Sequence, residues 1–375
     1  MKILSIFGTR PEAIKMAPLV KMLANDPYFS SSVCVTAQHR EMLDQVLEIF
    51  NIQPKYDLNL MTKNQSLSQL TSKMISKITD VLEKDQPDMV LVHGDTATTF
   101  AAALSAFYKQ IKIGHVEAGL RTGNLSSPWP EEANRRLTGV LTDMHFCPTE
   151  TSKRNLILEN VSSEKIFITG NTVIDSLLMI KSLINGDSSM QNSFFKKFGY
   201  LDPKKKLILV TGHRRENFGT GFINICKSLR NLAISNPNTQ IVYPVHLNPS
   251  VQKPVKELLS SIENIFLIEP LDYLPFVYLM DRSYLILTDS GGIQEEAPSL
   301  GKPVLVMRNT SERPEAIKAG TAKLVGTDSI KIEKEVQSLI NNKDLYHQMC
   351  HSHNPYGDGD SCSKIIKLLK ETETS

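Results

Sequence analysis

Short apolar runs alternate with longer amphipathic stretches from the first residues of this chain onward. Apolar runs separated by helical stretches are typical of β-α-β units, in which a parallel sheet is buried on both faces. The expected helical stretches include Pro18–Leu23, Glu41–Phe50 and Leu67–Leu82. The expected strands are Ile3–Phe7, Val33–Thr36, Met89–Val92, Ile113–Val116 and Met144–Phe146.

A second series of apolar runs follows the polar region Asn185–Lys206. A chain of 375 residues is long enough for two domains, each with its own core. We expect one domain at residues 1–170 and a second at residues 171–356, with the break near Gly170-Asn171. A helix at Ser361–Lys370, within residues 357–375, is expected to return to the first domain. The second strand series is Leu207–Thr211, Thr239–Pro244, Ile265–Ile268, Tyr284–Thr288 and Val304–Val306.

The composition gives no indication of a nucleic-acid or membrane partner. A formal net charge of +2, from 42 basic and 40 acidic residues, offers little attraction to nucleic acid or anionic lipid. No segment reaches the ~18 uninterrupted apolar residues of a membrane span. The five cysteines are scattered without a C-x-x-C pair, which favours a reducing cytoplasm over disulfides or a zinc site. We therefore expect a cytoplasmic protein that holds no metal.

Several cofactor motifs are missing from the sequence. The first strand is followed by the single Gly8 and not by G-x-G-x-x-G, the dinucleotide fingerprint. Neither the P-loop pattern G-x-x-x-x-G-K-[ST] nor the zinc motif H-E-x-x-H occurs. These absences argue against nicotinamide redox chemistry, P-loop ATP hydrolysis and zinc-dependent hydrolysis.

The segment Thr288–Ala297 has the features of a nucleotide site. It follows an apolar strand, and Gly291-Gly292 lets the backbone of a helix start approach a diphosphate closely. Glu296 follows about one helical turn later, where a carboxylate can accept hydrogen bonds from ribose hydroxyls. The simpler alternative is a glycine turn that precedes an ordinary acidic first turn.

Carboxylates follow two apolar strands of the first half. Asp95 and Glu117 stand at carboxyl ends of strands, the edge where open α/β sheets place their ligands. Glu131 and Arg135 lie four residues apart at the start of a capped helix and therefore on one face. Helix capping and a surface ion pair are sufficient to explain Glu132. They account poorly for Asp95 and Glu117, because a carboxylate beside a buried strand end is unfavourable without a partner.

Basic residues follow the first strand of each half. His213 lies in a loop with two arginines directly after Leu207–Thr211. The hexapeptide Arg10–Lys15 recurs as Arg313–Lys318, each time with proline where a helix is expected to begin. One interpretation is an anion-facing helix start in each domain. The other is coincidence or a shared preference of helix starts.

These motifs in this order resemble those of the non-hydrolysing UDP-N-acetylglucosamine 2-epimerases. The bacterial enzymes that supply ManNAc units for enterobacterial common antigen or capsule are the most similar kind. The resemblance runs from the first residues to Asn354–Gly359. Its motifs are Phe7–Lys15, His93–Thr96, His115–Arg121, Pro130–Arg135, Gly212–Glu216 and Asp289–Glu296.

The resemblance implies a glycosyltransferase-B-like fold, with two Rossmann-like domains whose parallel sheets face each other across a cleft. It implies reversible conversion of UDP-GlcNAc to UDP-ManNAc without an added cofactor, by a homodimer. Family positions for a second, regulatory substrate site match Gln38, His39, Arg214 and Glu216. The substrate-binding positions match Arg10, Lys15, Asp95, Glu117, His213, Phe276, Ser290, Gly291, Gly292, Glu296 and Arg313.

For the chemistry, we expect UDP to leave C1 while a base removes the proton on C2. Re-addition of UDP to the 2-acetamidoglucal would complete the epimerisation. The candidate acids and bases are Asp95, Glu117 and Glu131, and Arg135 and His213 are candidates to stabilise the departing diphosphate. Two alternatives stay open at this point. One is a glycosyltransferase with the same fold, and the other is a non-catalytic UDP-sugar sensor.

Overall fold

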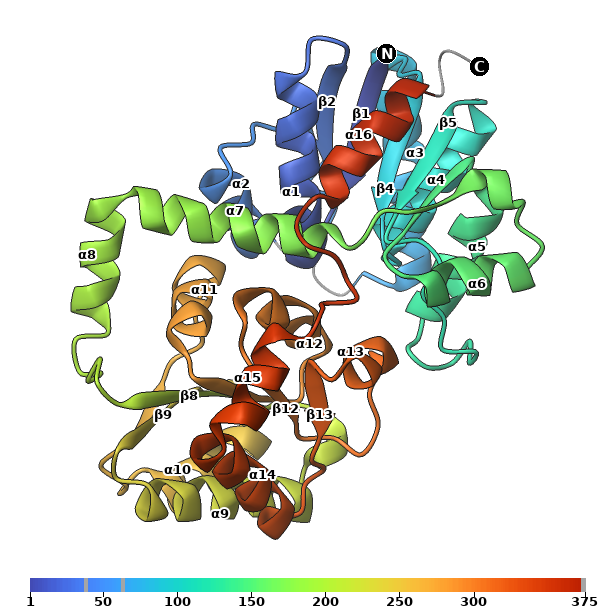
Figure 1. The fold of residues 1–375 in the computed structure, drawn as a ribbon. Coiled ribbons are helices and arrows are strands. Elements are labelled where there is room, and N and C mark those ends of the chain that lie inside the picture. Colours follow the sequence, from blue (N-terminus) through green and yellow to red (C-terminus); the bar gives the residue numbers. More distant parts are fainter. Residues whose placement is uncertain (37–39, 62–64, 372–375) are drawn as a thin grey trace. The chain divides into compact units, whose positions relative to one another are not determined.

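The computed structural model describes residues 1–36, 40–61 and 65–371 (Figure 1). The chain forms two compact units. The first unit consists of Met1–Ser176 together with Tyr356–Ser375, and the second unit is Leu177–Pro355. The chain therefore passes from the first unit to the second within one helix and returns near its C-terminus.

The described residues of the first unit form a seven-stranded sheet in the order β3-β2-β1-β4-β5-β6-β7. All neighbouring strands are parallel, as the alternation of apolar and amphipathic segments predicts. The strands are β1 (Lys2–Phe7), β2 (Ser30–Val35), β3 (Tyr56–Asp57), β4 (Met89–His93), β5 (Lys112–Val116), β6 (Met144–Cys147) and β7 (Ile166–Ile168).

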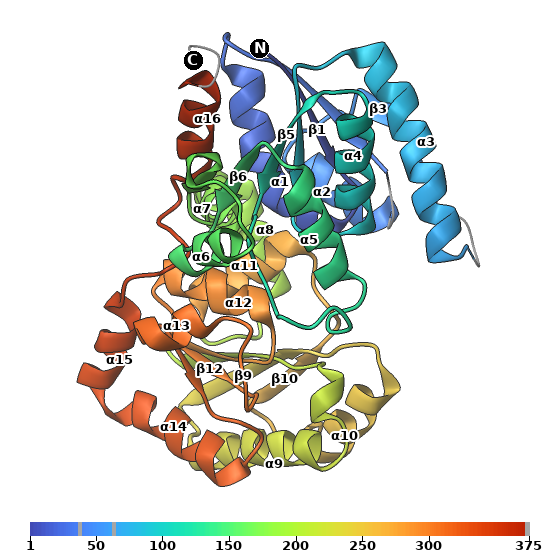
Figure 2. The same cartoon turned by 90° about the vertical axis from the view of Figure 1, so that its right-hand side faces the viewer.

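Helices cover both faces of this sheet (Figures 1 and 2). On one face, apolar residues of β1 and β4 pack against α3 and α4 in a single buried cluster. On the other face α1 packs beside α2 and α16. The helices are α1 (Arg10–Asn25), α2 (Arg40–Ile49), α3 (Leu67–Asp85), α4 (Ala97–Tyr108), α5 (Glu131–Leu141), α6 (Glu150–Leu158), the 3-10 helix η1 (Ser163–Lys165), α7 (Thr172–Gly186), which continues into the second unit, and α16 (Ser361–Glu371).

The C-terminal segment belongs to the first unit through specific contacts. Asn171 N donates to the Tyr356 carbonyl at 2.7 Å, and Cys362 N donates to the Asp175 carboxylate at 2.9 Å. At the far end of α16, Lys370 Nζ lies 2.6 Å from the Asp26 carboxylate. These contacts fix α16 beside α1.

The second unit contains a parallel six-stranded sheet among the described residues, in the order β10-β9-β8-β11-β12-β13. Its strands are β8 (Lys206–Thr211), β9 (Thr239–Pro244), β10 (Ile265–Ile268), β11 (Leu285–Thr288), β12 (Val304–Val306) and β13 (Ala322–Leu324). Its helices are α8 (Ser188–Lys197), η2 (Arg215–Asn217), α9 (Thr220–Ser235), α10 (Pro249–Leu259), α11 (Tyr273–Arg282), α12 (Gly291–Glu296), η3 (Ala297–Leu300), α13 (Pro314–Ala319), α14 (Ser329–Asn341) and α15 (Lys343–His351).

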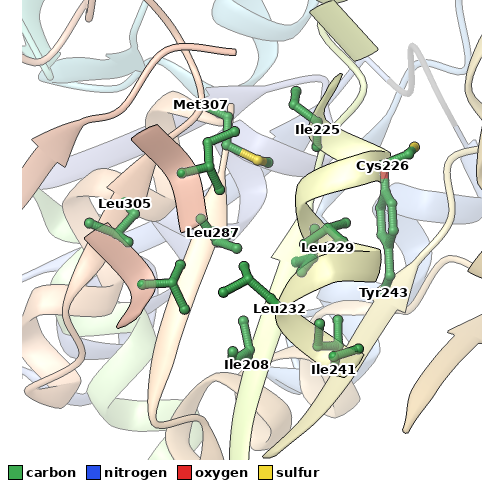
Figure 3. Close-up of a cluster of buried hydrophobic side chains, with 14 of the residues drawn as sticks. Ile208, Ile225, Cys226, Leu229, Leu232, Ile241, Tyr243, Leu287, Leu305 and Met307 are labelled. Atoms are coloured by element: carbon green, nitrogen blue, oxygen red, sulfur yellow. The ribbon is translucent and has the colours of Figure 1, made fainter. Parts of the chain in front are cut away.

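The core of this second unit lies between the sheet and α9, α10 and α14. Figure 3 shows Ile208 and Leu287 from the strands beside Leu229 and Leu232 of α9. These four side chains are at most 3% exposed. Helices α11 and α12 lie on the opposite face of the sheet (Figure 2).

The predicted α/β class with two parallel sheets is confirmed. Three short strands escaped prediction, namely β3, β7 and β13, and each has only two or three residues. Helix α1 begins at Arg10 and continues through Pro18, so the expected helix at Pro18–Leu23 is its second half. No helix in the described part of the chain is long and apolar enough to cross a membrane.

Candidate active site

The carboxyl ends of β1, β4 and β5 place several polar residues at one edge of the first sheet. After β4 the chain turns at Gly94, and after β5 it turns at Glu117, both with positive φ, 68° and 63°. A non-glycine residue in this left-handed region is uncommon and is retained where the surroundings enforce it. The turn after β5 therefore fixes the direction in which the Glu117 side chain points.

The Glu117 carboxylate is almost fully enclosed, with 8% of the side chain exposed. Lys15, from the second turn of α1, forms a close ion pair with Oε1. Asn171 Nδ2 donates to the same oxygen at 2.9 Å. His93 Nε2 lies 3.7 Å from the other oxygen, Oε2. Charge pairing thus compensates the cost of burying this carboxylate.

Asp95 forms a close ion pair with Arg135 of α5. The backbone of Asp95 is held as well, because Asn134 Nδ2 donates to its carbonyl at 3.0 Å. Burial raises the pKa of the Asp95 carboxyl, and the nearby Arg135 guanidinium opposes that rise. A carboxyl with a raised pKa beside a fixed cation is suited to proton transfer.

Helix α5 differs from the prediction in two ways. Its N-cap is Pro130, which makes no side-chain capping bond, so the expected capped start is wrong. Glu132 is fully buried and accepts hydrogen bonds from Thr122 N at 3.0 Å and Gly123 N at 3.2 Å. The interpretation of Glu132 as a surface ion pair is therefore wrong, because the loop before α5 folds over it.

Arg135 does not pair with Glu131, its neighbour one turn away. Instead its Nη1 lies 3.2 Å from Glu132 while Nη2 contacts Asp95. Glu131 Oε2 is buried and forms no hydrogen bond with any described residue. A buried carboxylate oxygen without a partner is unfavourable and points to a ligand or substrate contact.

Sequence reasoning missed the role of Glu12, which is only 2% exposed. Its Oε2 accepts from Gly8 N at 3.0 Å and Thr9 N at 2.8 Å, and its Oε1 accepts from the Thr96 hydroxyl at 2.6 Å. Thr9 in turn caps α1. The T-x-x-E spacing is the signature of a capping box and was the available signal. Glu12 therefore joins the loop after β1 to the loop after β4, beside the half-buried Arg10.

In the second unit, the fully buried Asp289 organises the loop after β8. Its Oδ2 accepts from the backbone N–H groups of His213 and Arg214, each at 2.8 Å. The His213 ring stacks on His246 at 5.1 Å, with 44% of its side chain exposed. Partial burial lowers the pKa of His213, so the ring is neutral near neutral pH.

The first turn of α12 follows Asp289 and is flanked by two arginines. A Cβ placed on Gly291 would lie about 4 Å from the guanidinium groups of Arg214 and Arg313, so both cations face this backbone. Arg313 is also in close contact with the buried Glu295. Ser290 is the N-cap residue, and Gly292 leaves room beside the Glu296 carboxylate. The N-terminal amides of α12 and the two guanidinium groups together form a positively charged site suited to phosphate.

Glu296 is held by Tyr273 of α11, whose hydroxyl donates to Oε1 at 2.9 Å. Phe276, one turn further along α11, is half-buried. Of the residues expected at a regulatory site, Glu216 accepts from Arg308 Nε at 2.5 Å, and Arg214 Nη1 lies 3.7 Å from Glu312. Gln38 and His39 lie outside the described residues.

The repeated hexapeptide plays different parts in the two units. Lys15 pairs with a carboxylate at a strand end, whereas the corresponding Lys318 is exposed. Arg313, the N-cap of α13, faces α12, while Arg10 is the first residue of α1. In the first unit the lysine of the motif, Lys15, pairs with a buried carboxylate, and in the second unit the arginine, Arg313, does so.

Comparison with known proteins identifies the family of the chain. The sequence model of the UDP-N-acetylglucosamine 2-epimerases matches residues 21–370. The chain belongs to the UDP-N-acetylglucosamine 2-epimerase family. The Escherichia coli K12 member is 58% identical over 375 residues, which is 100% of both chains. The Campylobacter jejuni member is 58% identical over 371 residues, covering 98% of this chain and 97% of the relative.

Solved members of the family share the fold. UDP-GlcNAc 2-epimerase from Neisseria meningitidis, solved with UDP-GlcNAc bound, superposes with a TM-score of 0.90 at 55% identity. The match covers 99% of this chain and 100% of that chain. The Methanocaldococcus jannaschii epimerase in complex with UDP-GlcNAc and UDP gives a TM-score of 0.79 at 35% identity, with coverage of 99% and 100%. The chain is therefore an enzyme with UDP-N-acetylglucosamine 2-epimerase activity.

Proposed function

We propose that this epimerase interconverts UDP-GlcNAc and UDP-ManNAc by elimination and re-addition of UDP. The proton on C2, beside the acetamido group, is a very weak acid, so direct removal would create an unstable carbanion. Expulsion of UDP from C1 while the C2 proton leaves avoids that carbanion and gives 2-acetamidoglucal. Protonation of C2 from the opposite face and return of UDP to C1 then yield the epimer. No bond to a cofactor is needed in this sequence.

The observation that carries the proposal is the pair of carboxylates at the ends of β4 and β5. Asp95 and Glu117 are both largely enclosed, and each has its own cation, Arg135 and Lys15. Two carboxylates with separate partners can hold different protonation states at one pH, as an acid and a base must. The raised pKa of Asp95 favours its protonated form and so supports a role as acid. Glu131, with its unpartnered buried oxygen, is the third candidate.

We assign UDP to the second unit. The Gly291-Gly292 amides with Arg313 would bind the diphosphate, and Glu296 would accept hydrogen bonds from the ribose. His213 is neutral near neutral pH and would serve as a hydrogen-bond donor or proton carrier to the leaving diphosphate. The backbone of Phe276 and the side chain of Ser290 would complete the set of residues that bind UDP. Arg10 and Lys15, which match substrate-binding positions of the family, would neutralise negative charge on the substrate.

In the cell, we expect the product to supply ManNAc units for a cell-surface polysaccharide. The enzyme would then act in the cytoplasm, where nucleotide-sugars are made, as a homodimer. The polysaccharide role and the homodimer follow from the family resemblance, and the cytoplasmic location follows from the scattered cysteines.

The test is incubation of the purified protein with UDP-GlcNAc and no other addition, followed by proton NMR. UDP-ManNAc as the only new nucleotide-sugar, without lasting free UDP, is the expected result. Accumulation of UDP and free sugar would indicate hydrolysis instead. Unchanged substrate that still binds would favour a transferase lacking its acceptor, or a sensor.

A further inference from the structure

His93 is the last residue of β4. It is buried in the first unit, with only 3% of its surface exposed. Neither ring nitrogen forms a hydrogen bond with any described residue. Buried polar atoms without partners are rare in folded proteins, and each needs an explanation. A purely structural role would be served better by an apolar ring at this position.

A candidate catalytic carboxylate lies close to the ring. His93 Nε2 lies 3.7 Å from Glu117 Oε2, less than 1 Å beyond a normal hydrogen bond. The other oxygen of Glu117 is engaged by Lys15 and Asn171. Hydrogen bonds at active sites are often long without substrate and shorten when the reacting complex forms.

We propose that His93 is a positioning residue for Glu117, donating its Nε2 hydrogen to Oε2 during the reaction. This inference rests on the proposed function, because it assumes that Glu117 exchanges a proton with the sugar. Lys15 and Asn171 hold one oxygen of the carboxylate, and His93 orients the other. Both oxygens of the Glu117 carboxylate are thereby held. His93 does this as a neutral donor and so adds no second positive charge beside Lys15.

The charges around the pair support a neutral donor. Burial is the main cause that lowers the pKa of His93 to about 3; Glu117 opposes this shift, and Lys15 and His115 add to it. The ring therefore carries a single N–H in the neutral range. Besides these groups, Asp95 acts on Glu117 through its charge. A neutral donor stabilises the carboxylate without cancelling its charge, which keeps Glu117 able to take up a proton.

Removal of the His93 donor should shift the pH–rate profile of epimerisation. Loss of the donor disfavours the ionised form of Glu117, so that the carboxyl stays protonated to higher pH. If Glu117 is the base, the acidic limb of the pH–rate profile moves to higher pH. If Glu117 is the acid, the basic limb moves in the same direction. A role limited to packing would lower activity at every pH and leave the profile in place.

The experiment compares the wild type with His93→Phe, His93→Gln and His145→Phe. Glutamine can place an N–H close to the position of Nε2, and phenylalanine keeps the ring without a donor. His145 on β6 is a matched control, since it is 1% exposed, its ring nitrogens also lack partners, and it forms no ion pair among the described residues. Each variant is first checked for wild-type circular dichroism. Steady-state epimerisation is then followed across pH.

We expect kcat to fall about 10- to 100-fold in His93→Phe with little change in KM, together with the pH shift. His93→Gln should recover much of the rate and the wild-type profile, and His145→Phe should behave as the wild type. Should His93→Phe not fold, His93→Gln and His93→Asn decide, since only glutamine reaches the Nε2 position. Equal rates and profiles for all His93 variants would overturn the inference while leaving wild-type activity intact. An inactive wild type would instead refute the proposed function.

Discussion

The Tyr273 hydroxyl donates a hydrogen bond to Glu296 Oε1 at 2.9 Å and so ties α11 to the end of α12. Burial raises the pKa of Tyr273 well above its usual value, and the neighbouring carboxylate adds to the rise. The phenol therefore remains a donor over the whole working pH range. It fixes the orientation of the carboxylate that we assign to the ribose.

Substitution of Tyr273 by phenylalanine should weaken UDP binding about 10-fold, because a hydrogen bond to a charged group is lost. Isothermal titration calorimetry with UDP measures the effect. Tyr284→Phe is the control, since it removes a hydroxyl bond of the same length, to the Leu339 carbonyl, elsewhere in the second unit. Equal UDP affinities for the wild type and Tyr273→Phe would show that Glu296 does not depend on the Tyr273 hydrogen bond to bind UDP.

Asp95→Asn should lower kcat by roughly 10² to 10⁴, the usual contribution of a general acid or base. The amide keeps the size of the side chain but cannot carry the proton. Asp143→Asn is a suitable control, because that carboxylate accepts a bond from Ile113 N at 2.9 Å and has no assigned role in catalysis. An Asp95→Asn enzyme of near wild-type rate would remove Asp95 from the chemistry.

Arg135→Gln should move the limb of the pH–rate profile governed by Asp95 to higher pH. Burial already raises the pKa of Asp95, and the guanidinium is the main group that opposes the rise. Without Arg135 the protonated carboxyl therefore persists to higher pH. A pH series of kcat for both proteins provides the measurement. A shift to lower pH would mean that Arg135 does not act on Asp95 through its charge.

Glu12→Gln should lower the free energy of unfolding by about 1–3 kcal/mol, because an amide nitrogen cannot accept the hydrogen bonds that the replaced carboxylate oxygen accepts. Urea unfolding of the wild type and the variant measures the difference. Glu315→Gln, at the corresponding position of the repeated hexapeptide, is the control. Its side chain is only half-buried, so a smaller loss is expected.

The difference in unfolding free energy between the wild type and Glu12→Gln should depend on pH. Burial raises the pKa of Glu12 above its ordinary value of 4.5. The stabilisation from its protonated form is therefore complete below the unfolded-state pKa and is lost as pH rises through the folded-state pKa. The stability gap between the wild type and Glu12→Gln should narrow as pH rises. A gap that widens with pH would indicate that the site stabilises the ionised carboxylate.

Much of the fold could be predicted because parallel strands are buried on both faces. Strands such as Thr239–Pro244 and Ile265–Ile268 stand out as apolar runs, and the structure has the same bounds. The sheet-edge strands β3 and β13 could not be found in this way. They are too short for a periodic pattern, and β13 alternates Ala, Lys and Leu with only one residue buried.

The site was partly predictable for a similar reason. Asp95 and Glu117 closely follow apolar runs, so their sequence positions alone indicate the edge of a parallel sheet where ligands bind. The partners of these residues are distant in sequence, as with Asn171 and Glu117, and depend on how helices pack. The two copies of the hexapeptide show what local sequence cannot predict. Glu12 is buried and Glu315 is half-buried, although both have the same local sequence. Tertiary packing alone separates them.

Reversible cleavage of the bond between C1 and the diphosphate oxygen is the defining step of the proposed epimerisation. The direct measurement is phosphorus NMR of UDP-GlcNAc labelled with oxygen-18 in the bridge between C1 and the β-phosphorus. If UDP departs and returns, rotation of the free β-phosphate should distribute the label into the non-bridging positions during turnover. Formation of UDP-ManNAc with the label still wholly in the bridge would contradict elimination and require a route that leaves the C1–oxygen bond intact.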